Sequence, residues 1–200
     1  MTKIKFCGIS RASDILFINK LLPDYVGFVF WEKSKRYISQ KKAIELKSLL
    51  NPKIKSVGVF VNAEFEKIMS VIQIIDIIQL HGNEDERYIK NLRSLINKKI
   101  IKAFQIKSSQ DVDAAANSTA DYIMLDSGKG TGKNFDWALV KNISRQYFLA
   151  GGLNPENISE AIRRLNPFAV DVSSGIETDG VKDKSKMTAF INAVRKENLL

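Results

Sequence analysis

Residues 147–175 read YFLAGGLNPENISEAIRRLNPFAVDVSSG, and this stretch holds one complete unit of the predicted fold. Tyr147 to Ala150 and Ala169 to Val172 are short apolar runs bounded by turn-forming residues, which predicts two buried strands. Pro155 to Leu165 has apolar residues at three- and four-residue spacing opposite a polar face, which predicts a helix between them. Asn154 before Pro155 suits an N-cap followed by a first-turn proline. The stretch therefore predicts strand, helix and strand in succession.

The same unit recurs along the whole chain. Near-continuous apolar runs, typical of parallel strands covered on both faces, predict six more strands at Lys3 to Cys7, Tyr25 to Phe30, Ser56 to Val61, Ile75 to Leu80, Ile100 to Gln105 and Tyr122 to Leu125. Helical spacing predicts further helices at Ser13 to Leu22, Gln40 to Leu50, Glu64 to Ile72, Asp85 to Ile96, Ser109 to Ala116, Trp137 to Asn142 and Asp183 to Lys196. Asn83, before Glu84 and Asp85, is a second start signal. Successive strand ends are about 24 residues apart, enough for one strand, one helix and two short loops.

Eight such units predict an α/β chain in which residues 1–200 form a single-domain (β/α)8 barrel, because no residues remain for a second domain. The chain is close to the lower size limit of that fold, roughly 200 residues. An open, doubly wound sheet is the alternative. It is weakened because no predicted strand is followed by G-x-G-x-x-G.

Composition excludes several classes of protein. Of the 200 residues, 44% are hydrophobic and 26% are charged, which is typical of a globular domain. The longest apolar stretch, Val71 to Leu80, contains polar residues and is far shorter than the roughly 18 apolar residues of a membrane span. The amino-terminal residues carry charges where a secretory signal requires an apolar region. We therefore expect no membrane contact and a cytoplasmic location.

Cysteine and histidine each occur once, as Cys7 and His81. A single cysteine allows no internal disulfide, which agrees with a reducing cytosol. A zinc centre draws three or four ligands from these residue types, so the sequence argues against one. We expect neither a metal ion nor a cofactor.

The chain has 31 basic and 22 acidic residues, a formal net charge of +9. Such an excess could attract nucleic acid, an anionic membrane surface or a phosphorylated metabolite. The lysines are scattered, and no basic run reaches the roughly five to eight residues of a nucleic-acid patch. We expect a solvated basic surface and no nucleic-acid partner.

Two residues at predicted strand ends are candidates for acid–base chemistry, because a (β/α)8 barrel places its reacting groups there. Cys7 is either a small buried hydrophobe or a thiol facing the barrel mouth. With an ordinary pKa near 8.5 this thiol would be a workable base, its ionisation at pH 7.5 costing about 1.4 kcal/mol. Asp126 is either a turn residue or a general acid, and an acid would need a raised pKa.

The segment after Asp126, residues 127–133, reads SGKGTGK and invites a nucleotide-binding interpretation. The pattern G-x-x-x-x-G-K-[ST] would require glycine at Ser127 and serine or threonine at Asn134, so this interpretation fails. We expect either a flexible cover whose lysines meet an anionic substrate or an ordinary loop.

Two loops after predicted strands suit an anion. Gly151 and Gly152 lead into a helix, and Ser173, Ser174 and Gly175 precede what could be a short extra helix. Glycines let N–H groups approach an oxygen closely, and helix N-termini favour negative charge. Each loop alone could be a simple turn. Together, after strands seven and eight, they predict the phosphate pocket that is usual for this fold.

Two further residues are candidates for substrate binding. Arg36, in the loop after the second strand, could hold a carboxylate with its planar fork or could be a solvated charge. His81, just after the fourth strand, could contact substrate or could be a hydrogen-bonded structural residue.

Seven segments, in order, resemble the N-(5′-phosphoribosyl)anthranilate isomerase family of tryptophan biosynthesis. They are KFCGIS at 5–10, GFVF with SKRY at 27–30 and 34–37, GVF at 58–60, QLHG at 79–82, LDS with GTGK at 125–127 and 130–133, LAGGL at 149–153, and VDVSSGIE at 170–177. The departures are small: Phe6 stands where isoleucine is usual, and Lys35 where proline usually precedes the arginine. The missing proline leaves the second loop less rigid.

This resemblance implies an Amadori rearrangement of N-(5′-phosphoribosyl)anthranilate to 1-(2-carboxyphenylamino)-1-deoxyribulose 5-phosphate, without a cofactor. It implies that Asp126 is the general acid that protonates the ring oxygen and that Cys7 is the general base that removes the C2′ proton. Arg36 would hold the anthranilate carboxylate, and the loops of Gly152 and Ser174 would hold the phosphate. The positive charge would then steer an anionic substrate.

Two other functions stay open. A histidine-pathway phosphoribosyl isomerase performs the same rearrangement on a larger, two-phosphate substrate, but its first strand is expected to end in aspartate where this chain has Cys7. A basic barrel that binds RNA is the non-enzymatic alternative, and no basic strand interleaved with aromatic residues favours it. No motif indicates the oligomeric state, so the fold is compatible with a monomer or a homodimer.

Overall fold

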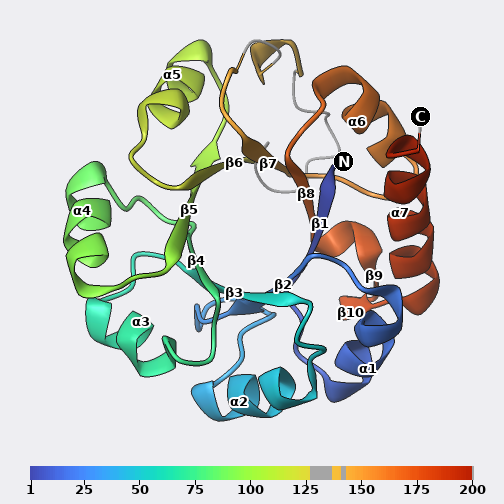
Figure 1. Ribbon diagram of the computed structural model, residues 1–200, viewed down its shortest axis with the longest axis horizontal. Helices are drawn as coiled ribbons and strands as arrows, with labels where there is room; N and C mark the ends of the chain where they lie inside the picture. Colours follow the sequence, from blue (N-terminus) through green and yellow to red (C-terminus); the bar gives the residue numbers. More distant parts are fainter. Residues whose placement is uncertain (127–136, 141–142, 200) are drawn as a thin grey trace.

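The computed structural model describes residues 1–126, 137–140 and 143–199. Eight parallel strands form a closed barrel in chain order, and helices surround it (Figure 1). The strands are β1 (Lys3–Cys7), β2 (Tyr25–Val29), β3 (Lys55–Phe60), β4 (Ile77–Leu80), β5 (Lys99–Gln105), β6 (Tyr122–Asp126), β7 (Tyr147–Ala150) and β8 (Ala169–Val172). The α-helices are α1 (Ala12–Leu21), α2 (Gln40–Leu49), α3 (Phe65–Val71), α4 (Glu86–Leu95), α5 (Ser109–Asn117), α6 (Ile158–Leu165) and α7 (Lys184–Glu197). The predicted (β/α)8 barrel is confirmed.

Side chains alternate between the two faces of each strand, and this alternation separates two cores. Outward-facing residues such as Phe6, Phe28 and Ile78 are fully buried between the barrel and the helices. Inward-facing residues fill the barrel, among them Tyr25, Val57, Ile77, Ile101, Ala103, Met124, Phe148, Ala150 and Ala169. Parallel strands covered on both faces explain why the strand sequences are almost continuously apolar. Any polar residue that faces the interior is therefore an exception that requires a reason.

Three short elements follow β8. The 3-10 helix η2 (Ser174–Ile176) is the short extra helix predicted from the sequence, and β9 (Glu177–Thr178) pairs with β10 (Val181–Lys182) in a small antiparallel hairpin. Asp179 and Gly180 turn this hairpin with φ of 52° and 76°, the left-handed conformations that two-residue hairpin turns require. Figure 1 shows the hairpin outside the ring, close to α1.

The predicted start of α6 is wrong. The helix begins at Ile158 with Asn157 as its N-cap, three residues after Pro155. Asn154 closes the turn directly before the helix: its Oδ1 accepts from the N–H groups of Glu156 and Asn157 at 3.0 and 2.9 Å, and its main-chain oxygen accepts from the N–H of Ile158 at 3.2 Å. The side chain that suits an N-cap satisfies a turn just as well, which is why the sequence pattern misplaced the boundary.

The start of α4 and the helix predicted at Trp137 to Asn142 also differ. Asp85, not Asn83, caps α4, because its carboxylate accepts from the N–H of Tyr88 at 2.8 Å. Trp137–Val140 is the 3-10 helix η1, and residues 141–142 lie outside the described ranges. None of the helices in the described ranges combines the length and the hydrophobicity that crossing a membrane requires.

Candidate active site

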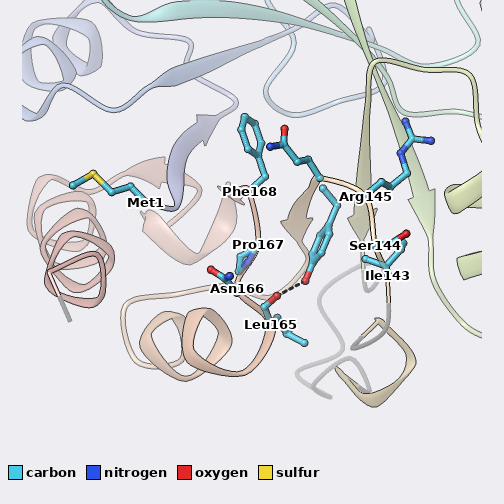
Figure 2. Close-up of a pocket in the computed structure, with 10 residues that line it drawn as sticks. Met1, Ile143, Ser144, Arg145, Leu165, Asn166, Pro167 and Phe168 are labelled. Atoms are coloured by element: carbon cyan, nitrogen blue, oxygen red, sulfur yellow. Dashed lines mark hydrogen bonds between the residues drawn. The ribbon is translucent and has the colours of Figure 1, made fainter.

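The amino-terminal end of the barrel carries a cavity of about 440 Å³ beside β7 and β8 (Figure 2). Its main polar groups are engaged in holding the fold. The Arg145 guanidinium donates to three main-chain oxygens of residues 116–120, and the Tyr147 hydroxyl donates to that of Leu165 at 2.8 Å. The reacting groups of a barrel lie at the other end, where the strands finish.

Cys7 is the last residue of β1, and its side chain faces the interior at that carboxyl end. It packs with Val29 and Val59, and it is 9% exposed. Burial raises the pKa of the Cys7 thiol, and the ammonium groups of Lys5 and Lys182 offset only part of this effect. Ionising Cys7 in the free protein is therefore harder than ionising a thiol of ordinary pKa.

An ion pair that the sequence analysis missed lies in the interior next to Cys7. Lys5 Nζ donates to Asp171 Oδ1 at 2.8 Å, joining β1 to β8, and the two side chains are 0% and 8% exposed. Burial opposes the charge on Lys5, but the attraction of Asp171 and of the Cys7 sulfur outweighs it and raises the pKa of Lys5. Lys5 is therefore a charged ammonium group at neutral pH.

Asp126, the last residue of β6, lies in a hydrogen-bonded chain with His81 and Gln79. His81 Nε2 is 3.1 Å from Asp126 Oδ2, and His81 Nδ1 is 3.0 Å from Gln79 Nε2. An amide nitrogen can only donate, so with the amide in this orientation Nδ1 accepts and Nε2 carries the proton that bonds Asp126. With the Gln79 amide in this orientation, these hydrogen bonds set the tautomer of His81 and the direction of the carboxyl group.

Arg36 lies across Gly8, the residue after Cys7, and Glu177 holds it there. Arg36 Nε and Nη2 donate to the two oxygens of the Glu177 carboxylate at 2.7 and 2.5 Å. Gly8 has φ of 77°, and a Cβ there would collide with the Arg36 side chain. Within the described part of the chain Arg36 Nη1 has no acceptor, so the Nη1/Nη2 edge of the fork is left for another carboxylate.

Lys182 extends this cluster to the end of β8. Its Nζ donates to Glu177 at 2.6 Å and to the main-chain oxygen of Ser173 at 2.9 Å, and its side chain is 3% exposed. The Ser173 hydroxyl in turn donates to the main-chain oxygen of Cys7 at 3.2 Å. The hairpin β9–β10 is thereby tied to the ends of β1 and β8, and Arg36 is fixed relative to Cys7.

Replacing Glu177 by glutamine is expected to lower the free energy of unfolding at pH 7 by about 3 kcal/mol, because it leaves the buried Lys182 ammonium without a carboxylate. Burial opposes ionisation of Glu177, but the hydrogen bonds from Arg36 and Lys182 outweigh it and lower its pKa. A lowered pKa stabilises the fold above the unfolded value, near 4.3, and this contribution is lost as the pH falls through the folded value.

Urea unfolding of both proteins at pH 7 and pH 3 measures this difference, which should be large at pH 7 and small at pH 3. Glu45→Gln is the control, because Glu45 forms an exposed pair with Lys42 and should change stability by less than about 0.5 kcal/mol. A Glu177→Gln protein as stable as the wild type at pH 7 would contradict the assignment.

The two glycine-containing loops lie against each other at the carboxyl end. Gly151 and Gly152 have φ of 90° and 63°, and a Cβ on Gly175 would collide with the main-chain oxygen of Leu153. Among the described residues, the N–H groups of Gly152, Ser174 and Gly175 have no hydrogen-bond acceptor. Free N–H groups on two touching glycine loops are the arrangement that a phosphate group requires.

Sequence reasoning did not single out Lys5, Gln79, Asp171, Glu177 or Lys182. A signal existed for three of them, since each stands two residues before a candidate on the same strand or its end: Lys5 before Cys7, Gln79 before His81, and Asp171 before Ser173. Side chains two apart share a strand face. Glu177 and Lys182 depend on the fold of the hairpin, which the sequence pattern did not predict.

The carboxyl end of the barrel thus brings the candidate residues together. Cys7 and Asp126 both end strands that run in the same direction, and both side chains face the interior. Arg36, His81 and the two glycine loops surround the same opening from the segments after β2, β4, β7 and β8. The lysines expected to cover it, at 129 and 133, lie outside the described residues. The described residues hold no group of three or more His, Cys, Asp or Glu side chains arranged for a metal ion.

A family model described as N-(5′phosphoribosyl)anthranilate (PRA) isomerase matches residues 4–193. Proteins named N-(5′-phosphoribosyl)anthranilate isomerase from Endomicrobium trichonymphae and Clostridium acetobutylicum are 45% and 46% identical to this chain, over 98% of it and 99% of each relative. The crystal structure of phosphoribosyl anthranilate isomerase from Thermotoga maritima matches with a TM-score of 0.90 and 40% identity, over 98% of this chain and 100% of that one. A phosphoribosyl anthranilate isomerase structure in complex with reduced 1-(o-carboxyphenylamino)-1-deoxyribulose 5-phosphate matches with a TM-score of 0.88 and 39% identity, over the same shares.

Proposed function

Because this chain belongs to the N-(5′-phosphoribosyl)anthranilate isomerase family, we propose that Asp126 and Cys7 are the acid and the base of its reaction. The chain is an isomerase of tryptophan biosynthesis that rearranges phosphoribosylanthranilate. Neither the histidine-pathway isomerase nor the RNA-binding barrel gains support from these relatives. The observation that supports the two roles most is that Cys7 and Asp126 face the interior at the same end of the barrel.

The reaction begins at the sugar ring. The Asp126 carboxyl donates a proton to the ring oxygen as the C1′–O bond breaks, and the anthranilate nitrogen supplies the electron pair of the resulting Schiff base. The hydrogen bond from His81 to Oδ2 orients the carboxyl group that delivers this proton. The product of this step is an open chain with a cationic C1′=N bond.

Cys7 then acts on the open chain. Its thiolate takes the proton from C2′, and the electrons of that C–H bond reduce the cationic C1′=N bond to an enolamine. The enolamine becomes the ketone when the C2′ hydroxyl loses its proton and C1′ gains one. No atom or electron is added overall, so acid and base groups suffice, each typically contributing about 10² to 10⁴ in rate.

Arg36 and the glycine loops bind the two anionic ends of the substrate. The free edge of the Arg36 fork receives the anthranilate carboxylate, since Glu177 already occupies the other edge. The N–H groups of Gly152, Ser174 and Gly175 receive the phosphate, with Gly151 and Ser173 shaping the two loops. The hydrogen bond between His81 and Asp126 supports a role for His81 in orienting the acid, and contact of His81 with the substrate stays a prediction.

The activity is tested by following the fluorescence of enzymatically generated phosphoribosylanthranilate, which disappears as the substrate is consumed. We expect rapid loss of the signal with this chain and no turnover of the histidine-pathway substrate supplied in the same assay. Turnover of the second substrate alone would overturn the assignment.

The single-domain organisation, a cytoplasmic location and a monomeric or homodimeric state stay predictions.

Replacing Gly175 by alanine tests the phosphate site. The added Cβ collides with the Leu153 oxygen, so the two loops must separate and the N–H groups no longer converge on one point. We expect KM to rise about tenfold or more, equivalent to the loss of one or two charge-assisted hydrogen bonds, and inorganic phosphate to inhibit correspondingly less. Gly180→Ala is the control, since Gly180 lies in the hairpin turn, where an added Cβ meets nothing within 4 Å. An unchanged inhibition constant for phosphate in Gly175→Ala would argue against the site.

A further inference from the structure

Lys5 carries its charge inside the barrel, where the loss of hydration makes a charged group energetically unfavourable. Its side chain is fully buried among the inward-facing residues, and its one protein oxygen partner in the described residues is Asp171, at 2.8 Å. An ammonium group has three donors, and a buried ion pair stabilises a fold no better than well-packed apolar side chains would. Stability of the fold therefore does not explain why the Lys5–Asp171 pair is present in the barrel interior.

The position of Lys5 near Cys7 explains the pair, because the Lys5 nitrogen and the Cys7 sulfur lie close together. Lys5 and Cys7 are two residues apart on the same face of β1, and the attraction of the Cys7 sulfur is one of the causes that raise the pKa of Lys5. Gly27 of β2 pairs with Cys7, and a Cβ there would lie 2.8 Å from Cys7 Sγ and 3.2 Å from Lys5 Nζ. The sulfur of Cys7 and the nitrogen of Lys5 therefore border the same small space, which a side chain on residue 27 would fill.

Other charges face Cys7 from neighbouring elements, but each has its own partner. Lys182 of β10 donates to Glu177 and to the main chain of Ser173, and Arg36 is held in two hydrogen bonds by Glu177. Asp171 of β8 is the one carboxylate paired with Lys5. Of the three cations, Lys5 alone lies on the same strand as Cys7, two residues before it.

We infer that Lys5 is a positioning residue whose ammonium group, held by Asp171, stabilises the Cys7 thiolate and orients it toward the barrel mouth. The inference rests on the proposed role of Cys7 as the base. With Cys7 protonated, Lys5 and Asp171 form a neutral pair. With Cys7 ionised, the same ammonium group bonds the sulfur and compensates its charge, so the buried thiolate is never an isolated anion. Burial raises the pKa of Cys7, and the charge of Lys5 lowers it.

The test measures the ionisation of Cys7 directly. Because Cys7 is the one cysteine of the chain, its ¹³Cβ chemical shift in cysteine-labelled protein gives its pKa without interference. Lys5→Met combined with Asp171→Asn removes both charges of the pair and leaves no unpaired ion. We expect the pKa of Cys7 to rise by at least about one unit, a tenfold loss of thiolate. The pH profile of kcat/KM should move to higher pH by the same amount, with KM changed less than about threefold.

Two further variants make the outcome decisive. Lys102→Met with Glu84→Gln removes another buried ion pair, outside the barrel interior, and should leave the pKa of Cys7 unchanged within about 0.3 units. Asp171→Asn alone keeps the ammonium group and removes the carboxylate that competes for it, so the pKa of Cys7 should fall. This variant decides the matter if the double variant does not fold.

An unchanged pKa of Cys7 in folded Lys5→Met/Asp171→Asn, or a rise in Asp171→Asn, overturns the inference. A failure of the proposed function looks different. In that case the Cys7→Ser protein retains activity, whereas the pKa of Cys7 in the wild-type background still reports whether Lys5 controls it.

Discussion

Replacing Asp126 by asparagine is expected to lower kcat by about 10³-fold or more while KM changes less than about threefold. Asparagine has nearly the same shape and can still accept the hydrogen bond from His81, which lies 3.1 Å from the carboxylate. It cannot release a proton to the ring oxygen, so the sugar ring no longer opens at the catalysed rate. Steady-state kinetics with the fluorescent substrate measures both parameters.

Asp121→Asn is the matched control, because it makes the same substitution just before the other end of β6. Asp121 accepts from Lys99 at 2.8 Å and from Arg93 at 3.0 Å, outside the barrel mouth. We expect it to lower stability and to leave kcat within about twofold. If Asp126→Asn keeps more than about a tenth of wild-type kcat, Asp126 is not the acid. The same conclusion follows if Asp126→Asn and Asp121→Asn lose kcat equally.

Strand ends were predictable from the sequence, and this is why Cys7 and Asp126 could be singled out as candidates for the base and the acid. Cys7 and Asp126 stand where an apolar run stops and glycine or serine follows, and the fold places such positions at one end of the barrel. The strands themselves are specified by burial on both faces, which leaves a strong and local signal. Helix boundaries are less clear, because a residue such as Asn154 can cap a helix or close a turn with the same hydrogen bonds.

Contacts between distant residues were not predictable in the same way. Glu177 and Arg36 are far apart in the sequence, and their bidentate pair exists because the hairpin after β8 folds over the segment after β2. The sequence indicated that the Arg36 guanidinium could hold a substrate carboxylate. In the structure the carboxylate of Glu177 already occupies one edge of that guanidinium. The free edge of Arg36, rather than the whole fork, is therefore the part that can recognise substrate. A substitution at Glu177 should disturb both stability and recognition.

Replacing Cys7 by serine is expected to lower kcat/KM by about 10³-fold or more at pH 7 to 8, because a hydroxyl ionises at far higher pH than a thiol. The pH profile of the wild type carries the same information. Burial raises the pKa of Cys7, and a base acts only when unprotonated. The pH profile of wild-type kcat/KM should therefore carry a titration above the ordinary thiol value near 8.5. In Cys7→Ser this titration should be absent.

Alkylation provides the control for this last prediction, since the chain has a single cysteine. A small haloacetamide should inactivate the wild type at a rate that rises with pH through the pKa of Cys7, because the thiolate is the nucleophile that reacts. Inorganic phosphate should not protect, since its proposed site at the glycine loops after β7 and β8 does not cover the sulfur, whereas the whole substrate should. Cys7→Ser should be indifferent to the reagent. A serine variant with more than about a tenth of wild-type kcat/KM, or alkylated wild type that stays active, would show that the C2′ proton leaves to another group.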